Sequence, residues 1–141
     1  MKQDNVLPED KWEFNEEVSG VFDNMLSRSI PDYATMRHLV TEIASTYYWK
    51  NRGTIADLGC SNGAGLQPII DKLGVQARYY GCDVSIPMLN ECKKRFAPYI
   101  ESDGAGAIPM RIEERDLMDG IPNITYSAIM SVLTWQFTPI E

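Results

Sequence analysis

The sequence of 141 residues has little histidine, little cysteine and no long apolar run. No apolar segment approaches the ~20 residues that a membrane-spanning helix needs, and residues 1–14 are too polar for a signal peptide. We therefore expect a cytoplasmic protein with no membrane partner. The single histidine, His38, has no partner within a motif, so we assign it no chemical role.

The cysteines exclude two further kinds of structure. Cys60, Cys82 and Cys92 form an odd set without a Cys-x-x-Cys pair, which indicates neither a disulfide framework nor a zinc site. We expect buried reduced thiols and no bound metal. Cys60 and Cys82 are expected near each other, because each ends a predicted strand.

Positive charge is also scarce. The 13 Lys and Arg residues against 20 Asp and Glu give a formal net charge of −7, which repels a phosphate backbone unless basic residues gather on one face. The densest basic run, residues 93–95, is typical of a solvated helix face. We therefore expect no direct nucleic-acid partner and favour a small-molecule substrate.

Helical and extended patterns alternate along the chain. They predict helices at 13–28, 29–49, 64–74 and 86–100, and strands at 54–60, 77–84, 107–117 and 126–137. This alternation is typical of an α/β fold with a parallel sheet covered by helices on both faces. In the helix at 29–49, apolar side chains repeat on one side, which we expect to face the core: Tyr33, Met36, Val40, Ile43 and Tyr47.

The last predicted strand is strongly apolar. A segment such as residues 127–135, SAIMSVLTW, should not form an open sheet edge, because unpaired backbone groups recruit other strands. We expect either that the natural protein continues beyond Glu141 or that a second copy, as in a homodimer, covers this edge.

A glycine-rich turn follows the first predicted strand. The stretch TIADLGCSNGAG, residues 54–65, contains Gly59, Gly63 and Gly65, with Ser61 where a dinucleotide site has a second glycine. No frame satisfies Gly-x-Gly-x-x-Gly, and no Gly-Lys-Ser/Thr follows, so the turn fits neither a dinucleotide site nor a P-loop. A strand-to-helix turn nevertheless directs backbone N–H groups at a ligand.

Three acids end three successive predicted strands around this turn. Asp57 precedes the glycines, Asp83 lies about 20 residues after Gly63, and Asp116 ends the third strand. An acid at the position of Asp83 accepts hydrogen bonds from ribose hydroxyls, and an acid such as Asp57 suits an ammonium group. The pattern fits a nucleoside bearing an amino-acid group, S-adenosylmethionine. The alternative for Asp83 or Asp116 alone is a helix cap.

Four segments resemble the class I S-adenosylmethionine-dependent methyltransferases, and more narrowly the carboxy-S-adenosylmethionine synthases of the tRNA wobble-uridine 5-oxyacetate pathway. They are WEFNEEVSGVFDNMLSRSIPDY, DLGCSNGA, CDVSIPMLNECKKRF and LTWQFTP, within residues 12–139. The resemblance implies a Rossmann-like sheet, here its first four parallel strands. It also implies a helical lid at residues 1–53 before a ligand-binding half-domain at 54–141, with S-adenosylmethionine or its carboxylated form as the cofactor.

The family's binding residues transfer to matching positions here. The resemblance implies that Tyr33 is a lid residue and that the glycine turn supplies backbone contacts to the amino-acid portion of the ligand. It implies that Asp83 and Val84 hold ribose and that Asp116 and Leu117 flank adenine. The full candidate set is Tyr33, Asp57, Gly59, Cys60, Ser61, Gly63, Asp83, Val84, Asp116 and Leu117. Trp135 and Phe137 are expected in the core.

Two departures leave the reaction open. Val132 stands where the family has an asparagine, and the family's carboxylate-holding arginine lies in a C-terminal half that is absent here. Arg28, Arg111 and Arg115 are the nearby cations, and none matches the family position. Methyl transfer and carboxy transfer, which in this family takes its carboxyl group from prephenate, remain alternatives. So does a non-catalytic binding half-domain that needs a second chain; the catalytic residue stays unassigned.

Overall fold

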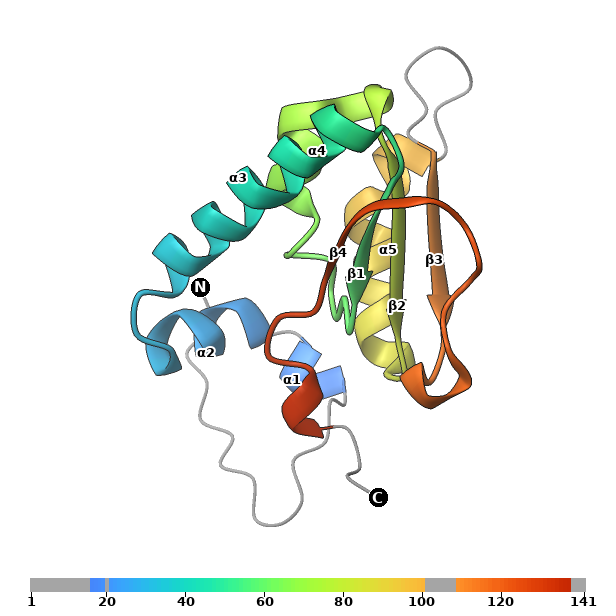
Figure 1. Cartoon of the computed structure of the whole chain (residues 1–141). Helices are drawn as coiled ribbons and strands as arrows, with labels where there is room; N and C mark the ends of the chain where they lie inside the picture. The colour runs from blue at the N-terminus through green and yellow to red at the C-terminus, as the bar shows by residue number, and fades with distance from the viewer. Residues whose placement is uncertain (1–15, 20, 101–108, 138–141) are drawn as a thin grey trace.

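A computed structural model describes residues 16–19, 21–100 and 109–137 of the chain (Figure 1). The α-helices are α1 (Glu16–Ser19), α2 (Phe22–Ser29), α3 (Tyr33–Asn51), α4 (Gln67–Leu73) and α5 (Ile86–Ile100). The strands are β1 (Thr54–Leu58), β2 (Arg78–Asp83), β3 (Met110–Glu114) and β4 (Tyr126–Met130). Short 3₁₀ helices are η1 (Gly74–Gln76), η2 (Leu117–Asp119) and η3 (Trp135–Phe137).

The four strands form one parallel sheet in the order β3-β2-β1-β4. β1 lies between β2 and β4, with Asp57 opposite Gly81 on one side and Met130 on the other. The expected fold class, an α/β structure with four parallel strands and flanking helices, is confirmed. All four strands point the same way, so their carboxyl ends meet at one edge of the sheet.

Among the described residues, the α-helices that contact this sheet lie on only one of its faces, so the expectation of a sheet covered by helices on both faces is wrong. One large cluster joins side chains of α3, α4 and α5 to Ile55 and Tyr79. The opposite face holds a smaller cluster, including Leu58 and Tyr80, that packs against η2 and the segment after it. The chain steps from β1 to β2 to β3 in one direction, and right-handed crossovers then place α4 and α5 on the same side. α3, which precedes β1, packs on that side as well. Figure 1 shows the β3–β4 connection crossing the other side.

The face of α3 that contacts the sheet also differs from the expected one. Thr41, Ala44, Ser45 and Tyr48 are buried, whereas the expected Ile43 is 57% exposed; Tyr47 is 50% exposed. Small side chains let the helix approach closely, and the hydroxyls stay satisfied within it: Thr41 donates to the carbonyl of Arg37 at 2.9 Å, and Ser45 donates to that of Thr41 at 2.7 Å. Val40, which was also expected on the inner side, does pack against the core cluster, so the prediction is right for Val40 and wrong for Ile43 and Tyr47.

Several predicted elements extend beyond the observed ones: the strands expected at 54–60 and 107–117 end at Leu58 and Glu114, and two further elements differ more. The helix expected at 13–28 is divided, because α1 ends at Ser19 and α2 begins at Phe22; residues 13–15 and 20 lie outside the described part. The strand expected at 126–137 ends at Met130. The chain then turns over β1, where the hydroxyls of Ser131 and Thr134 donate to the carbonyl of Leu58 at 2.9 and 3.1 Å.

β4 is an edge strand of the described sheet, paired with β1 alone. Its Ile129 side chain is 50% exposed. Among the described residues, no helix is long and apolar enough to cross a membrane.

Candidate functional site

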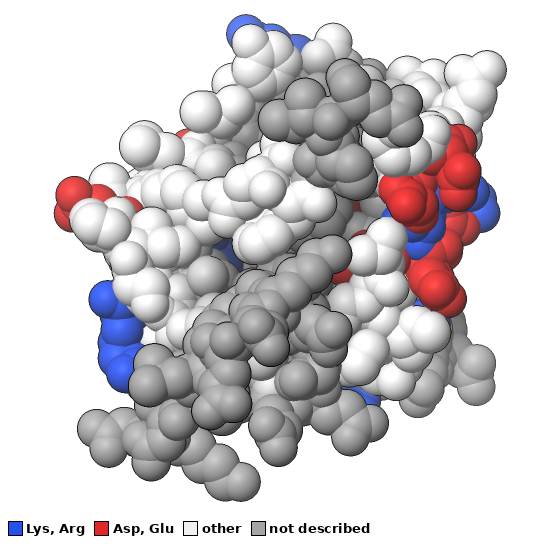
Figure 2. Space-filling model, turned by 90° about the horizontal axis from the view of Figure 1, so that it is seen from below, with Lys and Arg blue, Asp and Glu red and all other residues white. Residues whose placement is uncertain are grey.

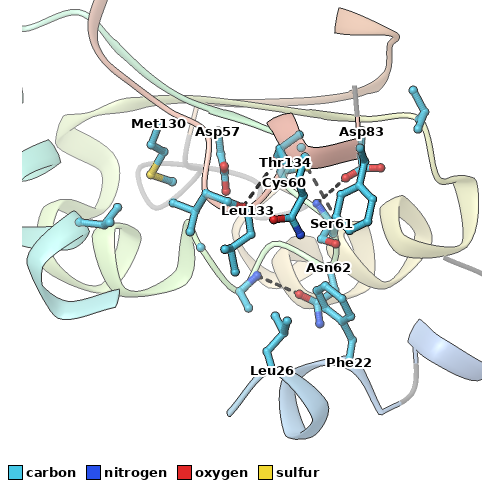
Figure 3. Close-up of a pocket in the computed structure, with 18 of the residues that line it drawn as sticks. Phe22, Leu26, Asp57, Cys60, Ser61, Asn62, Asp83, Met130, Leu133 and Thr134 are labelled. Carbon is cyan, nitrogen blue, oxygen red and sulfur yellow. Dashed lines mark hydrogen bonds between the residues drawn. The ribbon is translucent and has the colours of Figure 1, made fainter. Parts of the chain in front are cut away.

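A cavity of about 540 Å³ lies at the carboxyl ends of the strands, between the sheet and the N-terminal helices (Figure 3). All the candidate residues from the sequence line it, except Gly63. The convergence of Asp57, Asp83 and Asp116 on one cleft is therefore confirmed as geometry. Figure 3 shows Phe22 and Leu26 of α2 across the cavity from Asp57 and Met130.

Three glycines in the turn after β1 each leave room for a different neighbouring side chain. A Cβ on Gly59, whose φ is +78°, would lie 2.3 Å from Oγ1 of Thr134. A Cβ on Gly63 would lie 2.4 Å from the ring of Phe96, so Gly63 serves the packing of the turn on α5 and not the cavity wall. A Cβ on Gly65 would lie 2.5 Å from Oδ2 of Asp57. Gly65 thus leaves room for that carboxyl group.

Asp83 closes the turn from the neighbouring strand. Its Oδ2 accepts a hydrogen bond from the backbone N–H of Ser61 at 2.9 Å, and its Oδ1 accepts one from that of Ser85 at 2.9 Å. Ser61 has a φ of +53°, in the left-handed region that glycine occupies more easily. The hydrogen bond from Asp83 helps to hold serine where dinucleotide sites have glycine. Each carboxylate oxygen keeps acceptor capacity for a further donor.

Asp57 is the most unusual group in the cavity wall. Its side chain is 5% exposed and lines the cavity, yet among the described residues it makes no hydrogen bond and no ion pair. Burial raises the pKa of Asp57 to about 7, against the opposing charge of Arg37, and Asp83 raises it further. A buried carboxyl group that faces a cavity without a partner is suited to a cationic ligand.

Asp116 and Leu117 form the rim beside η2. Oδ1 of Asp116 accepts a hydrogen bond from the backbone N–H of Met118 at 2.9 Å, so this acid is a helix cap, as the alternative for it held. It is exposed and also lines the cavity, as does Val84. Leu117 is half-buried and packs under the sheet. The hydrogen bond from Met118 therefore fixes the carboxyl group of Asp116, which still lines the cavity.

Of the cations considered from sequence, only Arg115 lines the cavity; Arg28 and Arg111 do not. Arg115 donates to Glu113 at 2.7 Å, and Arg111 also pairs with Glu113. Although burial opposes the effect, hydrogen bonds from Arg115 and Tyr80 lower the pKa of Glu113 to about 2. Figure 2 shows acidic and basic side chains gathered together on the side where β3 lies. Arg115 therefore already has an anionic partner, which it shares with Arg111.

Sequence reasoning missed Arg37, which also lines the cavity. Its Nη1 donates to Oη of Tyr33 at 3.0 Å and its Nη2 donates to the carbonyl of Ala64. The signal was available, because Arg37 follows the candidate lid residue Tyr33 by four positions on one helix, and such residues share a face.

The N-terminal helix α2 is tied to the glycine turn by Asp23. Its carboxylate accepts hydrogen bonds from Nδ2 of Asn62 and from Nη2 of Arg95, both at 3.0 Å. Arg95 also donates to the backbone carbonyl of Asn62 at 2.9 Å. Arg95 therefore belongs to an interhelical contact and not to the solvated face expected for residues 93–95. We call this contact the Asp23 bridge.

Two aromatic residues expected in the core lie elsewhere. Trp135 is 60% exposed and Phe137 is 53% exposed, and Phe137 lines the cavity together with Val132. The turn after β4 carries η3 away from the sheet, and Gln136 and Phe137 of η3 line the cavity, whereas Trp135 does not. Phe137 is thus a further wall residue that the sequence did not reveal.

The three cysteines are buried and free. The backbone N–H of Cys60 donates to the carbonyl of Cys82 at 2.9 Å, which confirms that these residues are neighbours. A side-chain hydrogen bond with Cys92, together with burial, raises the pKa of the Cys60 thiol well above its ordinary value. Within the described ranges, no three His, Cys, Asp or Glu side chains gather as a metal site.

Known proteins resemble this chain in sequence. A carboxy-S-adenosyl-L-methionine synthase of Glaesserella parasuis is 37% identical over 134 residues, covering 91% of this chain and 51% of that protein. The synthase of that name from Wolinella succinogenes is 41% identical over 90 residues, covering 63% and 38%. The chain spans about half the length, or less, of these curated relatives. No protein-family model matches it.

Solved structures resemble it in fold. An S-adenosyl-L-methionine-dependent methyltransferase from Methanococcus maripaludis superposes with a TM-score of 0.58 at 21% identity, covering 95% of this chain and 57% of that one. The plantazolicin methyltransferase BpumL, in complex with SAH, gives 0.55 at 20% identity, covering 79% and 40%. Sequence and fold agree: the chain is similar, over about half their length, to carboxy-S-adenosyl-L-methionine synthases, and it has the fold of S-adenosylmethionine-dependent methyltransferases.

Proposed function

We propose that the protein is an S-adenosylmethionine-dependent transferase that acts on a small molecule. One observation carries the proposal: the carboxyl group of Asp57 is buried, faces the cavity and has no partner among the described residues. An α-amino group would supply the missing cation. The names of the relatives and the fold support the same ligand.

The cavity fits a ligand of this size and polarity. Its volume of about 540 Å³ lies within the usual range for small-molecule sites. The amino-acid end would lie at the glycine turn beside Asp57, the ribose would bond to Asp83, and adenine would lie between Val84 and Leu117. This order follows the strand ends from β1 to β3.

The residues of this chain would contribute mainly orientation and exclusion of water. When bound, S-adenosylmethionine supplies a carbon attached to positively charged sulfur, which is already activated for transfer. Phe22, Leu26 and Met130 form an apolar wall opposite and beside Asp57, which limits water in the cavity (Figure 3). Holding two reactants in line in such a site supplies much of the rate enhancement.

Two alternatives remain for the reaction: carboxy transfer and methyl transfer. Similarity to carboxy-S-adenosyl-L-methionine synthases favours the carboxylated product, and we infer from the same similarity a place in the supply of a donor for tRNA modification. The net charge of −7 argues against contact with tRNA itself. Val132, which lines the cavity, argues for methyl transfer, because an apolar side chain cannot bond to an anionic product.

A second candidate function is ligand binding without transfer. One observation favours it: β4 is an edge strand of the described sheet, paired with β1 alone. A second chain that pairs with β4 would then complete the sheet. Such a module would bind the nucleoside and leave it unchanged.

Calorimetry with S-adenosylhomocysteine tests the proposed ligand. We expect the full chain to bind it and Asp57→Asn to weaken binding at least tenfold, because a neutral amide cannot pair with an ammonium group. Asp71→Ala is the matched control, since Asp71 bonds to Gln67 on the exposed side of α4. Mass spectrometry of the nucleoside that copurifies then separates the reactions. Absence of binding by the unmodified chain would refute the proposal.

A further inference from the structure

We propose that Arg37 binds the carboxylate of the ligand's amino-acid end, while Asp57 binds the ammonium group on the same carbon. The inference deepens the proposed function and rests on it. It assigns a role to a residue that matches no expected site position and fixes the direction in which the amino acid lies along the cavity wall.

The guanidinium group is held in place at the edge of the glycine turn. Its Nη1 donates to Oη of Tyr33 at 3.0 Å, and its Nη2 donates to the carbonyl of Ala64. The group also stacks over the Tyr33 ring at 5.5 Å from the centroid. A cation fixed by two tethers loses little further freedom when an anion binds.

The same group has capacity left for an anion. A guanidinium carries more N–H donors than these two hydrogen bonds use. Within the described residues Arg37 forms no ion pair, although its positive charge is half-buried in a cavity with largely apolar side chains. Arg115, the other arginine in the cavity wall, already pairs with Glu113. Arg37 is therefore the cation in this wall that lacks a counter-ion.

Arg37 and Asp57 together match a zwitterion. Both line the cavity beside Ala64 and Gly65, and they are close enough for the charge of Arg37 to act on Asp57. They nevertheless make no direct ion pair with each other. Opposite charges that face one cavity without neutralising each other suit a group with both charges, and an α-amino acid is such a group.

The alternative is that Arg37 only anchors α3 to the glycine turn through Ala64. Binding of two ligands separates these roles. S-adenosylhomocysteine has the carboxylate, and S-adenosyl-3-thiopropylamine lacks that group alone. We expect the unmodified full chain to bind the first at least tenfold more tightly, because a bidentate arginine–carboxylate contact is strong. In Arg37→Met this preference should fall to about twofold or less.

Further variants and ligands make the result decisive. Arg37→Lys keeps the charge and should retain part of the preference, whereas Asp57→Asn should weaken both ligands. Thermal unfolding of each variant reports the integrity of the fold.

A preference that survives in Arg37→Met would overturn the inference, as would an equal loss of affinity for both ligands in that variant. If the unmodified chain binds neither ligand nor 5′-methylthioadenosine, the proposed function itself fails. Binding of 5′-methylthioadenosine as tight as that of S-adenosylhomocysteine would overturn the amino-acid subsite alone.

Discussion

The backbone N–H of Ser61 donates a hydrogen bond to Oδ2 of Asp83 over 2.9 Å, so an acid at the end of β2 holds the turn that follows β1. Ser61 needs this support because its φ is +53°. The acid expected from sequence to bind ribose therefore has a structural task as well. Its replacement should affect both the ligand and the turn.

Asp83→Ala should weaken binding of S-adenosylhomocysteine by about 1–3 kcal/mol, because ribose hydroxyls lose an acceptor. It should also lower the free energy of unfolding by about 1 kcal/mol, since the Ser61 and Ser85 N–H groups lose their partner. Calorimetry and urea unfolding measure the two effects. Asp83→Asn, which keeps one acceptor oxygen, should lose less in both. Unchanged affinity in Asp83→Ala would show that the ribose lies elsewhere.

The raised pKa of Asp57 predicts an unusual dependence of stability on pH. Its pKa is about 7 in the folded protein against 3.8 as the ordinary value, so the folded state holds the proton more tightly than the unfolded chain. This group therefore lowers the free energy of unfolding as pH rises from about 4 to about 7. Asp57→Asn removes the effect. Its free energy of unfolding, relative to that of the unmodified protein, should therefore rise by at least about 1 kcal/mol from pH 5 to pH 8. Urea unfolding at both values tests this; a constant difference would contradict it.

Gly65→Ala should disturb the site through one contact. Its Cβ would lie 2.5 Å from Oδ2 of Asp57, and the backbone there is not in the left-handed region, so the cost is steric. We expect about tenfold weaker binding of S-adenosylhomocysteine because the carboxyl group is displaced. In an Asp57→Ala background the same change should have little further effect. Equal losses in both backgrounds would place the cause outside this pair.

The Asp23 bridge should govern how quickly the cavity opens. Asp23→Ala removes the bonds to Asn62 and Arg95 that tie α2 to the turn. We expect faster release of S-adenosylhomocysteine in stopped-flow experiments, by a factor of about 3–10, with stability changed by less than about 1 kcal/mol since the pair is exposed. Asp71→Ala should leave the release rate unchanged. An unaltered rate in Asp23→Ala would mean that α2 does not limit release.

The positions of Asp57, Asp83 and Asp116 could be predicted because they depend on local pattern and one general rule. Asp57 and Asp83 lie in the last two residues of β1 and β2, Asp116 lies two residues after the end of β3, and parallel strands end at a common edge. The hydrogen bond between Ser61 and Asp83 could not be predicted, because it depends on how the ends of β1 and β2 are aligned along the strand direction. The same limit applies to Phe137, whose place depends on the turn after β4.

The error on α3 has a different cause. The pattern of Ile43 and Tyr47 marks one apolar side, but Ala44 and Ser45 allow closer contact with the sheet on another. The choice between the two sides depends on the shape of the partner surface, which sequence spacing does not contain. Arg37, by contrast, could have been predicted from its position four residues after Tyr33, because such residues share one face of a helix.

The pairing of β1 with both β2 and β4 has a consequence for how the protein folds. β2 follows β1 soon along the chain, whereas β4 begins only at Tyr126, so its docking closes a much longer loop. We expect β1, β2 and β3 to associate with their helices first and β4 to be added last. Val132 and Thr134, which immediately follow β4, line the cavity. The ligand would then bind only molecules in which this final assembly step is complete, and its binding would draw late intermediates toward the native state.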